Sequence, residues 1–451
     1  MRPGARGGMA PRMPPLAPLL CLLLLVGGVA AQAPIGPNQV HLSVVEDSST
    51  SITVTWWLPV PDDGTDLVVD RGLEEPLRVP GVLQTGPVPG AWYAATATGL
   101  VAGERYSYTV EGNGQVAGPF TFQTAGNATV VRFAAVGDMG ITADSRRSVE
   151  TLLALDPAFV LHPGDISYAE GDEQVWQAWF GMVEPLAATR PYMAAIGNHE
   201  TYTAAPVGAH LVTREETPHT PETRSYLTRF SLPGNELWYS FDWGGVHVVA
   251  LDTFASDFSE GSPQWAWLEQ DLAAAQGATW RIAFLHEPLY STNAHGSSLD
   301  VRAAFEPLFD RYGVDLVIQA HDHGYERSHG MRGGAVVAQG PDYVKGEGTV
   351  YVTTGGGGQS LYDSWSEEPW SAVHAARFHV LLLNATAEGL EVTAVPTDGK
   401  GPLDTFRILA TPLAAAPAAG AEEAPAAVPG VAPLAALVLL GAVAALRGRR
   451  T

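Results

Sequence analysis

Residues 131–138 read VRFAAVGD, a short apolar run that ends in glycine and aspartate. The same arrangement recurs at residues 159–165, FVLHPGD, and at residues 192–199, YMAAIGNH. The stretches between these runs, residues 145–155 and 173–186, have the composition of helices. Short apolar runs bounded by glycine and separated by helices are typical of β-α-β units. The pattern predicts an α/β domain with polar residues just past its strands, where open α/β sheets build their sites.

Later runs continue the pattern, with histidine as the residue that follows the strand. Residues 280–285 lead into His286, and residues 314–319 lead into His321 and His323. A single aspartate after a strand is more often a turn or a helix cap than a ligand, and paired histidines also occur on surfaces. Because all of these residues follow successive strands, they predict one shared metal site.

Eight side chains gather at these predicted strand ends: Asp138, Asp165, Tyr168, Asn198, His199, His286, His321 and His323. Apart from the tyrosine, they are ligands of the kind that suit zinc, manganese, iron or magnesium. Seven positions shared between two ions, with one carboxylate bridging, would make a two-metal site. Two such ions lie about 3.5–4 Å apart, clamp the attacking and leaving oxygens of an in-line displacement, and activate water as the nucleophile.

Residues 34–126 have the pattern of an all-β domain. Residues 51–57, SITVTWW, alternate with period two, as do residues 106–110 and 120–122, and glycine and proline punctuate the runs. We predict a small sandwich of the fibronectin type III kind. It contains no cluster of histidines and carboxylates, so the chemistry is expected in the domain that follows, residues 127–411.

The charge balance limits the partners. The 451 residues include 25 lysines and arginines against 48 aspartates and glutamates, a formal net charge of −23. Binding to nucleic acid needs a basic surface, so no nucleic-acid partner is expected. An anionic substrate would be repelled at long range and needs a local positive centre, which bound metal ions could supply.

The two ends of the chain have the composition of targeting segments. Residues 1–33 combine a basic start, an apolar run and the small-residue sequence AQA, which predicts a secretory signal peptide; an N-terminal membrane anchor is the alternative. Cys21, the only cysteine, falls in this segment, so the mature chain would have no disulfide and no thiolate ligand. Residues 412–430 are rich in proline and alanine and are interpreted as a linker. Residues 431–451 are an apolar stretch with a basic end, which fits a hydrophobic anchor or a sorting signal.

We therefore expect a protein that is secreted or at the cell surface, with membrane or cell-surface attachment through the C-terminal segment. No oligomeric state is predicted.

The motifs, in this order, resemble those of the metallophosphoesterase superfamily. They are Gly137-Asp138-Met139-Gly140, Gly164-Asp165, Gly197-Asn198-His199-Glu200, His286 and His321-Asp322-His323. Tyr168, three residues after Asp165, narrows the resemblance to the purple acid phosphatases. A phenol has a pKa near 10, so only a strong Lewis acid such as ferric iron favours its ionised form as a ligand. The resemblance, which extends over residues 36–410, implies a four-layer α/β/β/α metallophosphoesterase domain preceded by an all-β fibronectin type III-like sandwich.

The resemblance also implies a metal ligand set. The ligands implied for Fe(III) are Asp138, Tyr168 and His323. Those implied for a divalent ion, which is iron, zinc or manganese, are Asn198, His286 and His321, with Asp165 as the bridge. The implied reaction is hydrolysis of a small phosphate monoester, with metal-bound hydroxide as the nucleophile.

Two further histidines are implied to act on the substrate. His199, next to a ligand, would contact phosphate oxygens or the leaving group. His295, nine residues after His286, matches a family position that helps to protonate the leaving alcohol, an effect that is typically worth 10²–10⁴-fold in rate. An exposed loop histidine is the alternative interpretation of His295.

Departures from the family pattern remove no ligand. Ala320 and Ala283 replace the usual glycine and valine, and Asp322 would add charge near the site or support a ligand. His162 is interpreted as a packed residue or one that supports a ligand, and His247, inside an apolar strand, as a residue that satisfies a hydrogen bond in the core. The stretch 203–224, with His210 and His219, is interpreted as a polar surface loop.

Two other functions are compatible with parts of the pattern. A phosphodiesterase or nucleotide phosphatase of the same superfamily would have the same ligands. A non-catalytic cell-surface binding protein would use the sandwich and would have lost ligands, and none of the seven is lost.

Overall fold

The computed structural model describes residues 36–201 and 220–411. The predicted signal peptide, the linker at 412–430, the segment at 431–451, and His210 and His219 lie outside the described residues. None of the described helices is long and apolar enough to cross a membrane. The described residues as far as Ala410 belong to one compact unit.

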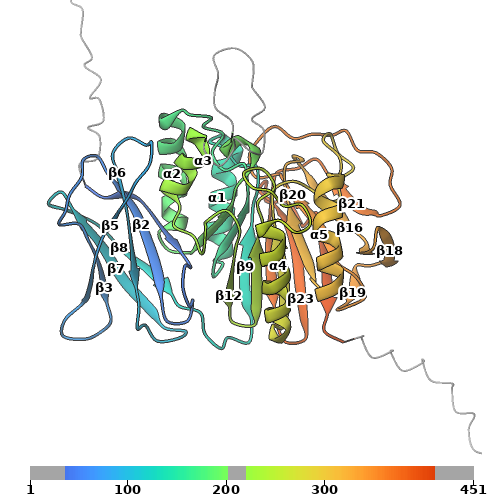
Figure 1. Ribbon diagram of the computed structural model, residues 1–451, viewed down its shortest axis with the longest axis horizontal. Helices are drawn as coiled ribbons and strands as arrows, with labels where there is room; N and C mark the ends of the chain where they lie inside the picture. Colours follow the sequence, from blue (N-terminus) through green and yellow to red (C-terminus); the bar gives the residue numbers. More distant parts are fainter. Residues whose placement is uncertain (1–35, 202–219, 412–451) are drawn as a thin grey trace, which may run out of the picture. The chain divides into compact units, whose positions relative to one another are not determined.

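The first part of the chain is a β-sandwich of two four-stranded antiparallel sheets (Figure 1). One sheet has the order β1-β2-β6-β5, with β1 Asn38–Ser43, β2 Ile52–Leu58, β6 Ala91–Ala97 and β5 Val82–Gln84. The other has the order β4-β3-β7-β8, with β4 Leu77–Pro80, β3 Asp66–Asp70, β7 Arg105–Gly112 and β8 Gln115–Gln123. Val54, Trp56 and Tyr108 belong to the core of this sandwich. The all-β prediction is confirmed, and the fibronectin type III kind stays a prediction.

Strand β2 is buried along its whole length, although its sequence alternates. Trp56 packs in the core of the sandwich, whereas Trp57 belongs to a second core that includes Trp92 and Phe180. Phe180 lies on α2, Glu173–Ala187, and its ring is 5.1 Å from that of Trp92. Successive side chains of β2 therefore enter two different apolar cores, because α2 covers the outer face of this sheet.

The rest of the described chain is built around two seven-stranded sheets. The first has the order β11-β10-β9-β22-β23-β24-β19. Its strands are β11 Tyr192–Ala195, β10 Val160–Pro163, β9 Val131–Ala135, β22 His379–Ala385, β23 Gly389–Pro396, β24 Asp404–Leu409 and β19 Asp342–Val344. The second has the order β12-β13-β14-β15-β20-β16-β21. Its strands are β12 Tyr239–Trp243, β13 Val246–Ala250, β14 Trp280–Phe284, β15 Leu316–Gln319, β20 Val350–Thr354, β16 Tyr325–Ser328 and β21 Ser371–Ala375. A small hairpin consists of β17 Gly330–Arg332 and β18 Ala335–Ala338.

Helices cover the two sheets on their outer faces. Phe133 and Leu161 of the first sheet share one core with Ile282 and Val350 of the second. Helices α4, Pro263–Ala274, and α5, Leu299–Tyr312, yellow and orange in Figure 1, pack in a separate core with the opposite face of β14 and β15. Helix α1, Ala143–Leu155, contacts α2 and β22 of the first sheet, and α3 is Pro221–Arg229. The four-layer α/β/β/α prediction is confirmed.

The strand directions bring several loops to one place. Strands β9, β10 and β11 are parallel, and so are β13, β14, β15 and β20. Gly137 N donates a hydrogen bond of 3.0 Å to Thr354 O, which joins the carboxyl end of β9 to that of β20. The loops that follow both sets of parallel strands therefore meet.

Candidate metal centre

The predicted ligands all lie in these loops. Asp138 follows β9, Asp165 follows β10, and Asn198 begins the short 3-10 turn Asn198–Glu200 after β11. His286 follows β14, and both His321 and His323 follow β15. The prediction that polar residues stand just past the strands is confirmed.

Three of these side chains form what we call the tyrosine cluster: Asp138, Tyr168 and His323. The hydroxyl of Tyr168 lies 3.1 Å from Asp138 Oδ1 and 3.0 Å from His323 Nε2. His323 Nε2 is 3.4 Å from the same Asp138 oxygen. One ligand atom of each residue therefore points at a common centre.

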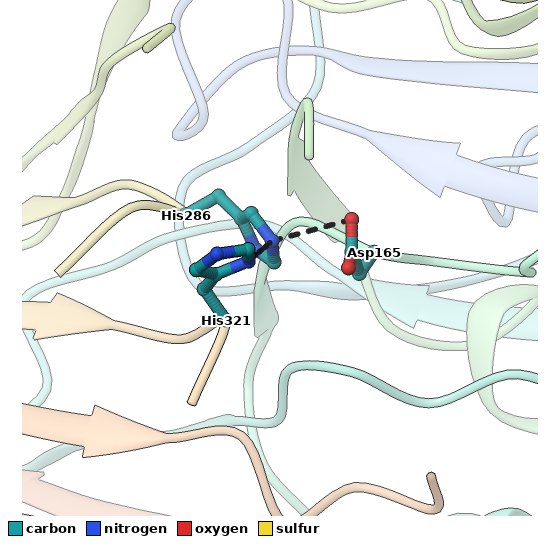
Figure 2. Close-up of side chains that lie close together, drawn as sticks. All are labelled: Asp165, His286 and His321. Carbon is teal, nitrogen blue, oxygen red and sulfur yellow. Dashed lines mark hydrogen bonds and ion pairs between the residues drawn. The ribbon is translucent and has the colours of Figure 1, made fainter. Parts of the chain in front are cut away.

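Four others form the asparagine cluster: Asp165, Asn198, His286 and His321. His286 Nε2 lies 3.0 Å from Asn198 Oδ1, 3.2 Å from Asp165 Oδ1 and 3.2 Å from His321 Nδ1. Ligand atoms of Asp165, His286 and His321 all lie within 4.8 Å of one another. Figure 2 shows the two imidazoles and the carboxylate converging.

Backbone carbonyls fix the tautomers of one histidine in each cluster. His286 Nδ1 lies 2.8 Å from Pro163 O, and His323 Nδ1 lies 2.8 Å from Ser360 O. A carbonyl only accepts, so each Nδ1 carries the hydrogen and each neutral ring presents an unprotonated Nε2 to its cluster. In both clusters, the unshared electron pair of this Nε2 then points toward carboxylate, amide or phenol oxygens, whose own electron pairs are also available to a cation. This donor set fits a bound cation.

The electrostatics of the asparagine cluster favour positive charge. Burial lowers the pKa of His286, but the Asp165 carboxylate outweighs it and raises the pKa to about 10. Without a metal, a proton therefore occupies the place between these ligand atoms. Burial and the neighbouring His286 lower the pKa of His321 to about 2, so His321 is neutral and able to bind a cation.

The backbone is strained at four of the predicted ligands. Asp138, Asp165, Tyr168 and His321 have φ values of 55°, 53°, 57° and 69°, in the left-handed region that residues other than glycine rarely adopt. Such conformations persist where surrounding structure over-determines them, commonly at functional sites. Four of the seven predicted ligands thus occupy conformations that packing and hydrogen bonds must enforce.

The two predicted catalytic histidines lie at the edges of the clusters. The ring of His199 is 4.1 Å from that of Tyr168, and its Nε2 is 3.8 Å from Asp165 Oδ2. The ring of His295 is 4.1 Å from that of His321. Both side chains are therefore placed beside the centre, on the tyrosine and asparagine clusters respectively.

Other residues of the site had no predicted role. Glu200 accepts backbone hydrogen bonds from Asp165, Ile166 and Gly197, and Glu170 Oε1 lies 2.6 Å from His199 Nδ1. Tyr362 stacks on His323, with ring centroids 4.3 Å apart and an interplanar angle of 10°. Phe254 lies 5.6 Å from His286. Only Glu200 had a sequence signal, as the last residue of Gly-Asn-His-Glu.

The two histidines interpreted as structural have structural contacts. His162 is fully buried, and its Nδ1 lies 2.7 Å from the hydroxyl of Tyr192. His247 is buried between the carboxylates of Asp242 and Asp271, at 2.8 and 2.9 Å. Both interpretations are confirmed.

The comparison with protein families defines the class of protein. Residues 131–325 match the family model of the calcineurin-like phosphoesterases. This range begins at β9 and ends just after the paired histidines, so it contains all seven predicted ligands. The chain therefore contains a calcineurin-like phosphoesterase domain.

Related proteins narrow the class. The chain is 32% identical to purple acid phosphatase 22 of Arabidopsis thaliana over 341 residues, which is 71% of this chain and 72% of the relative. It is 29% identical to acid phosphatase type 7 of Homo sapiens over 436 residues, 84% of this chain and 93% of that protein. Among solved structures, the purple acid phosphatase from yellow lupin (Lupinus luteus) seeds shares the fold, with a TM-score of 0.74 at 23% identity over 83% of this chain and 75% of that one. The chain belongs to the purple acid phosphatase family. It is a phosphoric ester hydrolase of the acid phosphatase type, and the prediction of a phosphatase is confirmed.

Proposed function

We propose that the tyrosine cluster holds Fe(III), that the asparagine cluster holds a divalent ion of iron, zinc or manganese, and that Asp165 bridges the two. The observation that carries this proposal is the convergence of carboxylate, phenol, amide and imidazole ligand atoms in both clusters. The phenol supports the ferric assignment. Burial and the Asp138 carboxylate raise the pKa of Tyr168 well above its ordinary value of 10, so ionising it as a ligand needs a strongly acidic cation.

The two cations would polarise the phosphoryl oxygens and lower the pKa of water, which are the contributions of a two-metal site. They would also attract a phosphate ester to a chain whose net charge is −23. His199, held by Glu170, would bind phosphate oxygens. His295 would donate a proton to the oxygen of the leaving alcohol, and its ring at 4.1 Å from His321 supports that role. The substrate would be a small phosphate monoester.

We further propose the boundaries 34–126 for the sandwich and 127–411 for the catalytic domain. The sheet composition supports them, because β8 ends at Gln123 and β9 of the first seven-stranded sheet begins at Val131. A secreted or cell-surface location is proposed from the composition of residues 1–33 and 431–451.

A visible absorption spectrum with metal analysis on the same sample tests the ferric assignment. We expect a broad band that gives a purple or pink colour and disappears in Tyr168→Phe. Tyr343→Phe is the matched control, because Tyr343 is a buried tyrosine on β19, outside both clusters. The absorption band should persist in this variant. A colourless wild-type protein that binds two divalent ions and still hydrolyses phosphate esters would contradict the ferric assignment.

A further inference from the structure

Asp322 lies between the ligands His321 and His323 and bonds to a different loop. Its Oδ1 accepts the backbone N–H of His295 at 2.9 Å. Its Oδ2 accepts the hydroxyl of Ser291 at 2.5 Å and the backbone N–H of Gly296 at 3.2 Å. The side chain is completely buried. All three donors belong to residues 291–296, which we call the His295 loop.

These bonds tie the His295 loop directly to the metal ligands. The chain neighbours of Asp322 are both predicted ligands, so its main chain is held at the centre from both sides. The backbone N–H of Asp322 also donates to Ala320 O at 2.8 Å. Any displacement of the Asp322 carboxylate would therefore shift the His295 loop relative to the clusters.

Other side-chain hydrogen bonds of this loop hold Thr292 and Asn293, which precede His295. Glu326 accepts the backbone N–H of Thr292 at 2.8 Å and its hydroxyl at 2.7 Å. The amide of Asn293 bonds to Tyr362 O and to Ser364 N at 3.3 and 3.2 Å. Asp322 is the residue that accepts a hydrogen bond from the backbone of His295 itself.

The His295 ring is held by packing. Within residues 36–201 and 220–411 its ring contacts are with His321, at 4.1 Å and 31°, and with Tyr362, at 5.4 Å. Its position thus depends on its backbone, which Asp322 fixes.

We infer that Asp322 is a positioning residue for protonation of the leaving alcohol: it holds the His295 loop so that the imidazole lies over His321, beside the asparagine cluster. This inference rests on the proposed role of His295. Catalytic geometry of this kind is sensitive, because small displacements of an acid from the atom it protonates lose much of its contribution.

The chemistry of Asp322→Asn makes the test informative. An amide has one accepting oxygen, and its nitrogen donates. With the nitrogen at the Oδ1 position it faces the His295 N–H, and with the nitrogen at the Oδ2 position it faces the Gly296 N–H. Either orientation sets two donors against each other, so the loop is loosened although the side chain keeps its size.

The measurement is the dependence of kcat on the leaving group, over phosphate monoesters from nitrophenyl to alkyl. An acidic phenol leaves without a proton, whereas an alkoxide needs one. We expect His295→Ala to lose about 10²-fold in kcat on alkyl esters and little on nitrophenyl esters. Asp322→Asn should show the same selective loss, about tenfold or more on alkyl esters. The double variant should be no slower than His295→Ala alone, with unchanged metal content.

Asp315→Asn is the matched control. Asp315 is another buried carboxylate that accepts a backbone N–H, from Arg281 at 2.9 Å, and it precedes β15 instead of following it. Its variant should lose stability without any leaving-group selectivity. Ser291→Ala removes a single donor to Asp322 and provides a milder second variant, with a smaller selective loss, should Asp322→Asn fail to fold.

The outcomes separate the two claims. A loss in His295→Ala that is equal on all esters removes the proposed role of His295 and this inference with it. A selective loss in His295→Ala, combined with an equal loss on all esters in Asp322→Asn and Ser291→Ala, overturns the inference alone. Loss of metal from Asp322→Asn, with an equal fall on every ester, also overturns it, because Asp322 would then support the ligands.

Discussion

The carboxylate of Glu200 accepts the backbone N–H of Asp165 at 3.0 Å, so a residue of one loop with predicted ligands fixes the main chain of another such loop. The same carboxylate accepts Ile166 N at 2.8 Å and Gly197 N at 3.0 Å. Glu200 is 1% exposed. It holds Asp165 in its left-handed conformation and sets the distance between the loops that carry Asp165 and Asn198.

Glu200→Gln should therefore weaken metal binding. Both carboxylate oxygens accept backbone N–H groups, so an amide nitrogen would face a donor in either orientation. A buried donor left unsatisfied costs about 1–3 kcal/mol, and we expect metal affinity to fall roughly tenfold to a hundredfold. Metal analysis after dialysis, with kcat on the same samples, measures this. Glu184→Gln, on the face of α2 toward β1, is the control; equal metal loss in both variants would contradict the prediction.

Glu170 should contribute to phosphate binding through His199. Its Oε1 lies 2.6 Å from His199 Nδ1 and orients the ring over Tyr168. Replacing the carboxylate by the neutral amide in Glu170→Gln should lower kcat/KM about tenfold, since a hydrogen bond to a charged group is worth about 1.5–3 kcal/mol. Steady-state kinetics test this, with the exposed α1 variant Glu150→Gln as the control. If Glu170→Gln is equally harmful when His199 is already alanine, the effect does not pass through His199.

The ligand loops were predictable because their signal is local. Each of Asp138, Asp165, His286 and His321 follows a short apolar run, and a strand end is a position that period and composition reveal. The resemblance to a family then assigned roles that spacing alone leaves open. Helices α1 and α2 were predicted for the same local reason, within two residues at each end.

The remaining features depend on contacts between distant parts of the chain. Strands β22 to β24 extend the sheet that contains β9. No local sequence pattern indicates that β22 pairs with a strand more than two hundred residues earlier in the chain. Tyr362 and Phe254 come from loops without periodicity, so nothing in their neighbourhood marks them as part of the site. Asp322 was expected to add charge or support a ligand, but its bond to the His295 loop requires knowing where that loop lies.

Two glycine substitutions should have opposite effects. A Cβ at Gly197 would overlap both the backbone nitrogen and Oδ1 of Asp165, so Gly197→Ala must move a predicted ligand. Activity should fall at least tenfold and metal should be lost. Gly181 lies inside α2 with open space where a Cβ would stand, and Gly181→Ala should raise stability by about 0.5–1 kcal/mol through helix propensity. Thermal unfolding and metal analysis of both variants check this; full metal content in Gly197→Ala would contradict the overlap argument.

His247 should make stability depend on pH in the alkaline range. Burial lowers its pKa, but the hydrogen bonds from its ring to Asp242 and Asp271 outweigh burial and raise the pKa to about 9. Because the folded pKa exceeds the unfolded value of 6.5, the protonated ring stabilises the folded state fully below pH 6.5, and this contribution is lost as the pH rises through 9. Relative to wild type, His247→Gln should be less stable by about 1–3 kcal/mol at pH 6, and the difference should shrink by pH 10. Urea unfolding of the two proteins at both pH values measures it, and comparing the same pair cancels the groups they share. A difference that stays constant from pH 6 to pH 10 would show that His247 contributes through packing and not through its charge.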